Sequence, residues 1–153
     1  MSIEELKQYF TEKYPEISFP EIASKLLNIE CPKEKVHGFS EQLKSDEKLQ
    51  FDYLFCQTAI DWPENLEVIY HLRSSSLNHE VVMRVKTDGR EKPEIDTICD
   101  IWRTAEFHER EIFDLYGVIF KNHPDLRRIL LEDDRIGHPM RKDYVDDINI
   151  ITL

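Results

Sequence analysis

The sequence predicts an α+β fold in which an antiparallel sheet of three or more strands packs against helices, followed by an extended C-terminal arm. Three observations predict it. Helical patterns stand on both sides of a central block of strand patterns, the strands follow one another through short connections without helices, and periodicity fades after residue 117. A chain of 153 residues holds one ordinary core, so no second independent domain is expected.

The first helix is predicted over residues 2–14. Ser2 is a suitable N-cap, Glu5 stands three positions later as in a capping box, and Pro15 ends the pattern. The apolar residues of this segment recur at helical spacing, which predicts one buried stripe. They are Ile3, Leu6, Tyr9, Phe10 and Tyr14.

The next elements change from mixed to strand-like. A short apolar run in 24–31 suggests a strand, and a second helix is predicted from Pro32 to about Asp46. Aromatic and β-branched residues then predict strands over 51–60, 66–72 and 80–86, separated by turn-forming residues. Because these three strands are joined by short connections, we expect them to pair antiparallel.

Helical spacing returns over about 96–116, and Gly117 stands where a left-handed C′ residue would end that helix. The apolar positions of this predicted helix are Ile98, Ile101, Trp102, Ala105, Ile112, Phe113 and Tyr116. Residues 118–153 contain two His-Pro dipeptides and predict an extended arm with turns. We therefore divide the chain into a globular part, 1–117, and an arm, 118–153, that docks on partner subunits.

Composition excludes several classes of function. The 20 basic and 31 acidic residues give a net charge of −11, which disfavours nucleic-acid binding. The three cysteines form no CxxC pair, and the four glycines form no nucleotide-binding loop, so neither a zinc knuckle, an iron–sulfur cluster nor a dinucleotide site is predicted. No apolar run approaches the ~18 residues of a membrane span, and the acidic start is unlike a signal peptide.

Charge is distributed unevenly along the chain. Residues 1–120 carry a net charge of −10, whereas residues 121–144 carry +1. The basic residues of this second stretch other than Lys121 are Arg127, Arg128, Arg135, Arg141 and Lys142. An acidic body with an arginine-rich arm is typical of a protein–protein docking device, and the alternative is a solvated charged tail.

One helical segment concentrates charged residues. Glu106 with Arg110 and Arg110 with Asp114 are four residues apart, which predicts a salt-bridged, exposed helix face. Glu111 and Asp114 are three residues apart and could act as a general acid and base. We favour the ion pairs, because no nucleophile or binding loop accompanies the two carboxylates.

Histidines provide a second candidate for chemistry. His123 and His138 each precede proline, and together with His71 and His79 they could converge on a metal ion in three dimensions. Their spacing along the sequence is not that of a chelating motif. Ordinary hydrogen-bonding or turn roles are therefore favoured.

Three blocks of the C-terminal half form a long and chemically mixed pattern. They run from Trp102 through Glu109-Arg110-Glu111, Asp114 and Gly117 to Val118, from His123-Pro124-Asp125 through Arg127-Arg128 to Leu130, and from Gly137-His138-Pro139 through Arg141-Lys142-Asp143 to Tyr144. This pattern closely resembles the C-type, 30 kDa subunit of type I NADH:quinone oxidoreductase, respiratory complex I. Weaker likeness reaches back to about residue 50. Asn122 and Phe107 stand where the family commonly has glycine and tryptophan.

The resemblance implies a structural and assembly subunit of the peripheral arm that is not itself catalytic. It implies that FMN, iron–sulfur clusters, NADH and quinone belong to partner subunits, that the D-type subunit is the chief partner and that the B-type subunit lies nearby. The whole complex would transfer electrons from NADH to quinone, coupled to proton translocation. Such a chain is expected on the cytoplasmic side of the cell inner membrane, with membrane contact only through the complex.

The residues expected to carry family identity and subunit contacts are those of the three blocks. They are Glu109, Arg110, Glu111, Asp114, Gly117, His123, Pro124, Asp125, Arg127, Arg128, His138, Pro139, Arg141, Lys142, Asp143 and Tyr144. Arg110 is expected to fix the helix end and Gly117 to turn the chain. Asp125 is expected to cap or pair within the arm. The basic side chains at 127, 128, 141 and 142 are expected to donate hydrogen bonds to a partner.

Three alternatives remain open from the sequence. The first is the equivalent subunit of a membrane-bound hydrogenase or of a ferredoxin- or F420-linked complex. The second is a stand-alone hydrolase that uses Glu111 and Asp114. The third is an adaptor unrelated to energy conversion.

Overall fold

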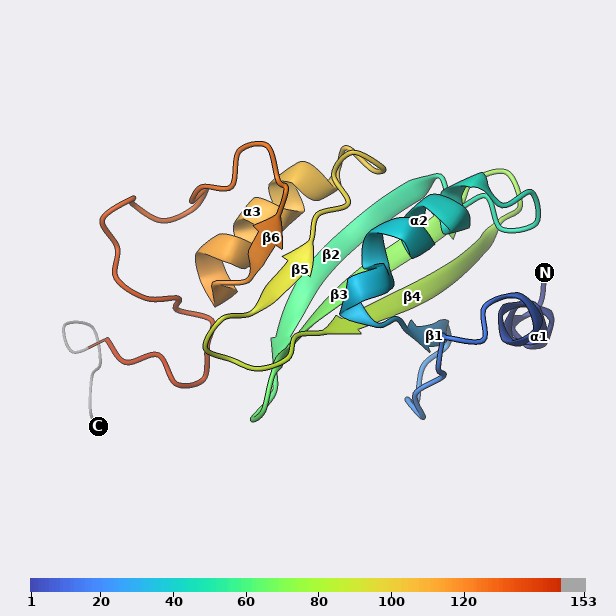
Figure 1. The fold of residues 1–153 in the computed structure, drawn as a ribbon, viewed down its shortest axis with the longest axis horizontal. Helices are drawn as coiled ribbons and strands as arrows, with labels where there is room; N and C mark the ends of the chain where they lie inside the picture. Colours follow the sequence, from blue (N-terminus) through green and yellow to red (C-terminus); the bar gives the residue numbers. More distant parts are fainter. Residues whose placement is uncertain (147–153) are drawn as a thin grey trace.

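The computed structural model describes residues 1–146, and Figure 1 shows its helices and strands in order along the chain. The helices are α1 (Ile3–Lys13), the 3₁₀ turn η1 (Lys33–Lys35), α2 (Val36–Ser45) and α3 (Ala105–Tyr116). The strands are β1 (Leu27–Glu30), β2 (Tyr53–Asp61), β3 (Leu66–Ser74), β4 (His79–Lys86), β5 (Glu94–Asp96) and β6 (Ile119–Lys121). The last seven positions of the predicted arm, 147–153, lie outside the described residues.

The two N-terminal helices confirm the predicted patterns. In α1 the hydroxyl of Ser2 accepts a hydrogen bond from the amide of Glu5 at 3.2 Å, and the Ser2 amide donates to the Glu5 carboxylate at 2.7 Å. Leu6 and Phe10 face the core. The second helix starts with the 3₁₀ turn directly after Pro32 and continues as α2.

The main sheet has the order β1-β4-β3-β2, and β2, β3 and β4 pair antiparallel as predicted. β1 adds a fourth strand that runs parallel to β4, with Leu27 opposite Val81 and Ile29 opposite Met83. The sheet is therefore mixed rather than purely antiparallel. Short connections predict only the pairing of consecutive strands, whereas β1 reaches its partner through α2 and two intervening strands.

The predicted helix over 96–116 is wrong in its first half. Glu94–Asp96 forms β5, which pairs in parallel with β6 at the start of the predicted arm, and α3 begins only at Ala105. Between them the amides of Ile101 and Trp102 both donate to the carbonyl of Ile98 at 3.0 Å, so separate turns occupy this stretch. These turns bury the same apolar residues that a helix would bury, and periodicity alone does not distinguish the two.

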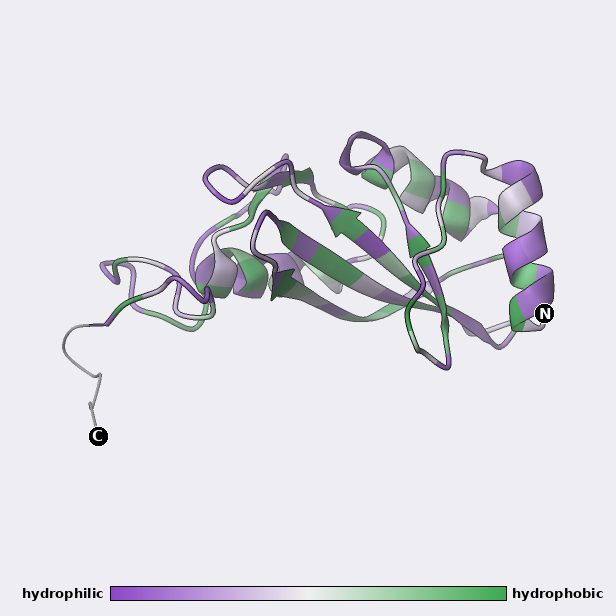
Figure 2. Ribbon diagram, turned by 90° about the horizontal axis from the view of Figure 1, so that it is seen from below, coloured by the Kyte–Doolittle hydropathy of each residue, from purple (hydrophilic) through white to green (hydrophobic). Residues whose placement is uncertain are grey.

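One hydrophobic core joins the sheet and the helices. Phe10 of α1, Phe51 before β2, Tyr70 of β3 and Phe120 of β6 are all buried in it. α3 packs against β2, while α1 and the arm lie at opposite ends of the long axis (Figures 1 and 2). None of the described helices is both long and apolar enough to cross a lipid bilayer.

Candidate functional site

Helix α3 carries three charged side chains that are buried rather than exposed. Glu109 and Asp114 have no exposed surface, and Arg110 is 7% exposed. Arg110 donates from Nε to the carbonyl of Arg127 at 3.2 Å and from Nη2 to the carbonyl of Arg128 at 3.0 Å. The prediction of an exposed helix with ion pairs centred on Arg110 is therefore wrong, because the arm covers this face of the helix.

Asp114 is the centre of the contact between α3 and the arm. Its carboxylate accepts a hydrogen bond from Arg128 Nη1 at 2.7 Å and three more from the backbone amides of Ile129, Leu130 and Leu131 at 2.8–3.1 Å. Burial raises the pKa of Asp114, but these amide and guanidinium donors outweigh it and lower the pKa below its usual value. We call Asp114, Arg128 and the turn 129–131 the clasp.

Arg128 also organises the arm beyond the clasp. Its Nη2 donates to the carbonyl of Arg135 at 2.8 Å and to that of Gly137 at 3.0 Å. The sequence predicts that Arg128 donates to a partner, whereas these contacts lie within the chain. Arg127 differs: its side chain is 66% exposed, and Nε contacts both oxygens of Asp125 at 2.9–3.0 Å. The predicted pairing of Asp125 within the arm is thus present.

The C-terminal end of α3 is capped by the third block of the motif. A helix leaves its last carbonyls without intrahelical donors. His138 Nδ1 donates to the carbonyl of Asp114 at 3.0 Å, the amide of Met140 to that of Leu115 at 3.0 Å, and Arg141 Nε to that of Tyr116 at 2.6 Å. The arm therefore supplies the donors that the helix end lacks.

Gly117 makes this cap possible. It adopts φ +76° as the C-cap of α3, as predicted. A Cβ atom at this position would lie 2.5 Å from Cδ2 of His138, so glycine is required both by the left-handed conformation and by the imidazole ring packed on it. Pro139 follows that histidine in the turn.

The end of the described arm is tied to β2. The amide of Lys142 donates to the Asp61 carboxylate at 2.8 Å, and Asp143 pairs with Arg90 at 3.0 Å. Arg90 also contacts Asp61. The hydroxyl of Tyr144 accepts a hydrogen bond from Arg135 at 2.8 Å. The predicted motif residues of this block are thus part of internal contacts of the chain.

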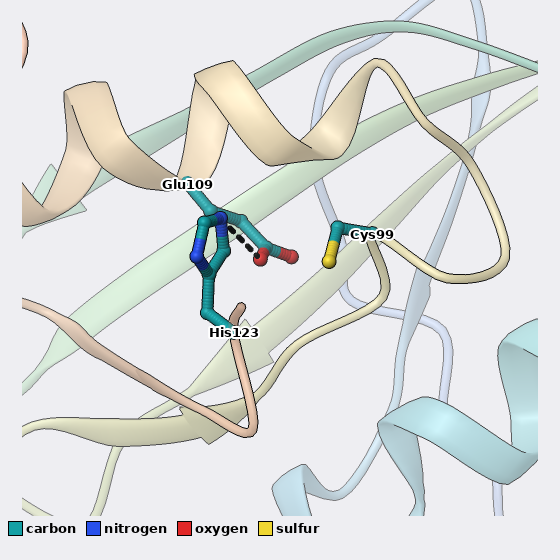
Figure 3. A group of neighbouring side chains, drawn as sticks. All are labelled: Cys99, Glu109 and His123. Carbon is teal, nitrogen blue, oxygen red and sulfur yellow. Dashed lines mark ion pairs between the residues drawn. The ribbon is translucent and has the colours of Figure 1, made fainter. Parts of the chain in front are cut away.

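Glu109 and His123 meet beneath the arm, together with Cys99 (Figure 3). The Glu109 carboxylate accepts from the amide of Ile98 at 3.0 Å and from the hydroxyl of Thr97, and burial raises its pKa to about 7. His123 Nε2 lies 3.9 Å from Glu109 Oε2. Of the four histidines that could bind a metal, only His123 belongs to a group with ligand spacing among residues 1–146.

Glu111 and Asp114 do not form an acid–base pair. Glu111 is exposed, whereas Asp114 is buried and its carboxylate is occupied by the four donors of the clasp. Pro124, another residue of the predicted set, lines a pocket together with Cys99. This arrangement does not favour the stand-alone hydrolase.

The arm exposes apolar side chains that no sequence pattern predicts. Leu130 is 63% exposed, Ile136 88%, Met140 53% and Val145 67%, and we call these four residues the arm apolar set. Hydrophobic segments are visible along this part of the chain in Figure 2. Their signal in the sequence is the occurrence of large apolar residues in a charged stretch without helical or strand periodicity, with Leu130 inside a short apolar run and the other three separated along the chain.

Comparisons with known proteins agree on one family. Residues 29–147 match the family described as respiratory-chain NADH dehydrogenase, 30 kDa subunit. The chain is 45% identical over 126 residues to the NADH-quinone oxidoreductase C/D-type subunit of Phocaeicola vulgatus, covering 82% of this chain and 24% of that protein. It is 43% identical over 115 residues to the corresponding C-type subunit of Moorella thermoacetica, covering 74% and 76% of the two chains.

Two further similarities are to proteins with other names. The chain is 39% identical over 140 residues to the C-type subunit of F420H2 dehydrogenase of Methanosarcina mazei, covering 88% of this chain and 86% of that one. A chain in the solved structure of an archaeal membrane-bound sulfane sulfur reductase matches with a TM-score of 0.79 and 27% identity, covering 95% of this chain and 86% of that chain. The chain spans about a quarter of the length of the Phocaeicola C/D-type relative.

Proposed function

The chain belongs to the respiratory-chain NADH dehydrogenase 30 kDa subunit family, and on this premise we propose that it is an assembly subunit of an NADH:quinone oxidoreductase. The arm apolar set is the observation that carries the proposal. The clasp and the helix cap use the buried charges of α3 to shape the arm, and large apolar side chains remain facing outward. A surface built in this way is suited to a partner protein.

The energetics favour a partner rather than solvent. Burying one leucine or isoleucine side chain contributes about 1.5–3 kcal/mol, so an arm with four exposed apolar residues gains stability when it is covered. Apolar anchors surrounded by arginine are a common composition of interface centres. Arg127 and Lys142 are the exposed basic residues of the motif, so their side chains are accessible to such a partner.

We propose the D-type subunit as the chief partner, with the B-type subunit nearby. The name of the Phocaeicola relative, which combines C and D, supports this choice, because a fused chain keeps its two parts at high effective concentration. In this proposal FMN, the iron–sulfur clusters and quinone are held by other subunits, this chain performs no step of catalysis, and it sits on the cytoplasmic side of the membrane. The complex as a whole would couple quinone reduction to proton translocation.

A second candidate keeps the assembly role and changes the complex. The similarity to the C-type subunit of F420H2 dehydrogenase and to a chain of a sulfane sulfur reductase complex favours it. The electron donor is recognised by other subunits in this proposal as well. An NADH- and flavin-binding protein among the co-purifying subunits would support the first candidate, and its replacement by an F420- or ferredoxin-linked one would support the second.

Co-purification from solubilised membranes tests the assembly role. We expect the tagged chain to retain a D-type subunit, and the double variant Leu130→Asp, Ile136→Asp to retain less than about one tenth as much. Losing the burial of one such side chain costs about 1.5 kcal/mol or more, and about 1.4 kcal/mol already corresponds to a tenfold loss of affinity. Leu77→Asp is the control, because it places an aspartate at an exposed leucine outside the arm, in the β3–β4 loop. Equal retention by all three proteins would refute the proposal.

A further inference from the structure

Three side chains with metal-binding atoms converge beneath the arm, from three separate segments (Figure 3). Cys99 comes from the turns before α3, Glu109 from the middle of α3, and His123 from the turn that follows β6. Their ligand atoms all lie within 4.8 Å of one another, and Glu109 Oε2 and His123 Nε2 are 3.9 Å apart. The side chains of Glu109 and His123 are fully buried, and Cys99 is 7% exposed.

We propose that Cys99, Glu109 and His123 form a zinc site that fixes the root of the arm to helix α3. One thiolate, one imidazole and one carboxylate are all accepted ligands of Zn²⁺, at bond lengths of about 2.0–2.3 Å. Ligand atoms around a tetrahedral ion with such bonds are roughly 3.3–3.8 Å apart. The present separations, 3.9 Å between Glu109 Oε2 and His123 Nε2 and within 4.8 Å for the whole group, are longer by up to about 1 Å, so binding requires the three side chains to move closer together.

Zinc binding would break two hydrogen bonds of the His123 imidazole, and the groups left behind can find other partners. His123 Nε2 now donates to the carbonyl of Glu106 at 3.0 Å, and its Nδ1 accepts from the amide of Asp125 at 3.0 Å. The Glu106 carbonyl lies in the first turn of α3, where the helical ladder also supplies it with a donor. Asp125 is exposed, so water can take over its amide when the imidazole proton moves to Nδ1.

The surroundings of the group supply further features of a metal site. The amide of Ile98 and the hydroxyl of Thr97 hold the Glu109 carboxylate in place, as donors behind a metal-bound carboxylate do. The side-chain amide of Gln57, which is 3% exposed, lies beside the same carboxylate and adds a further polar neighbour.

An entry path leads from the surface to Cys99. A pocket of about 520 Å³ has Cys99 and Thr97 in its lining, together with three acidic residues. These are Asp96, Asp100 and Glu106. Each of the three already pairs with a basic side chain, so the pocket provides access to Cys99 and no excess of negative charge. A zinc ion with three protein ligands keeps one position open, which a water molecule would occupy.

Metal titration of the full chain tests this inference independently of any partner subunit. We expect one Zn²⁺ per chain to bind and to raise the melting temperature, and Co²⁺ to give a thiolate charge-transfer absorption. Cys99→Ser should lower the affinity by more than about tenfold and abolish the absorption. Cys56→Ser is the matched control, because Cys56 lies outside the group, and it should behave like the unmodified chain.

A measurement on the unmodified chain keeps the test independent of how the variants fold. Zinc should protect Cys99, but not the partly exposed Cys56, from alkylation by iodoacetamide, as read by mass spectrometry of the peptides. Absence of a thiolate–cobalt absorption in the unmodified chain, or alkylation of Cys99 that zinc leaves unchanged, would overturn the inference. Loss of zinc binding by a folded Cys99→Ser variant would support it.

Discussion

Asp114→Ala is expected to release the arm from helix α3 and to lower the free energy of unfolding by roughly 3–5 kcal/mol, the usual cost of removing one partner of a buried ion pair. The variant leaves the Arg128 guanidinium without its carboxylate and three backbone amides of the turn 129–131 without their acceptor. Each of these donors then needs water, which reaches them only if the clasp opens.

Urea unfolding at pH 7 measures this effect. In the folded state the pKa of Asp114 lies below that of an unfolded aspartate, so its contribution to stability is fully present above pH ~4 and is lost only as the pH falls. Limited trypsin digestion should also cleave the variant faster after Arg127 and Arg128 than the unmodified chain. Glu111→Ala, an exposed position on the same helix, is the control and should change stability by less than about 0.5 kcal/mol. If the two variants were equally stable, the clasp would not hold the arm.

Gly117→Ala is expected to lower the free energy of unfolding by about 2–3 kcal/mol. A left-handed conformation costs a non-glycine residue roughly 1–2 kcal/mol, and displacement of His138 from the carbonyl of Asp114 adds about 1 kcal/mol. His138 is the first residue of the segment that caps α3. We therefore expect the substitution also to weaken the hydrogen bonds that residues 140 and 141 donate to the last carbonyls of the helix.

Gly38→Ala provides the matched comparison for this substitution. Gly38 lies inside α2, and a Cβ atom there would have no heavy atom within 4 Å. The same change is therefore expected to stabilise the chain by about 0.5–1 kcal/mol, through helix propensity alone. Thermal unfolding of both variants should shift the melting temperature in opposite directions. A downward shift for Gly38→Ala, or none for Gly117→Ala, would contradict this account of the two glycines.

Local patterns are sufficient to predict most of the elements. The capping box at Ser2, the alternation in 66–72 and the glycine at 117 each specify structure through contacts between near neighbours in the sequence. The parallel pairing of β1 with β4 and of β5 with β6 depends on contacts between distant segments. No local pattern encodes such pairing, and the turns over 98–104 show how tertiary packing produces a helix-like spacing without a helix.

The sequence predicts which residues form the candidate site but not which way they face. The three motif blocks do meet in space, since the second and third wrap the C-terminal half of α3. Sequence spacing places Arg110 and Asp114 on one helix face and cannot show that the arm covers that face. For this reason the sequence predicts that Arg128 is available to a partner. In the structure Arg128 instead binds Asp114 of α3 and carbonyls of the arm, and the exposed side chains of the arm include its apolar residues.

The most direct test of the central claim is photo-crosslinking from the arm within the membrane-bound complex. A photoreactive amino acid at Ile136, which is 88% exposed, should crosslink to a D-type subunit, and the same probe at Leu77 should give no such product. That result would mean that the arm, which is held in shape by the buried charges of α3, contacts a partner subunit through its apolar side chains. If the probe at Ile136 stayed uncrosslinked while the probe at Leu77 captured the D-type subunit, the docking surface would lie at the other end of the molecule.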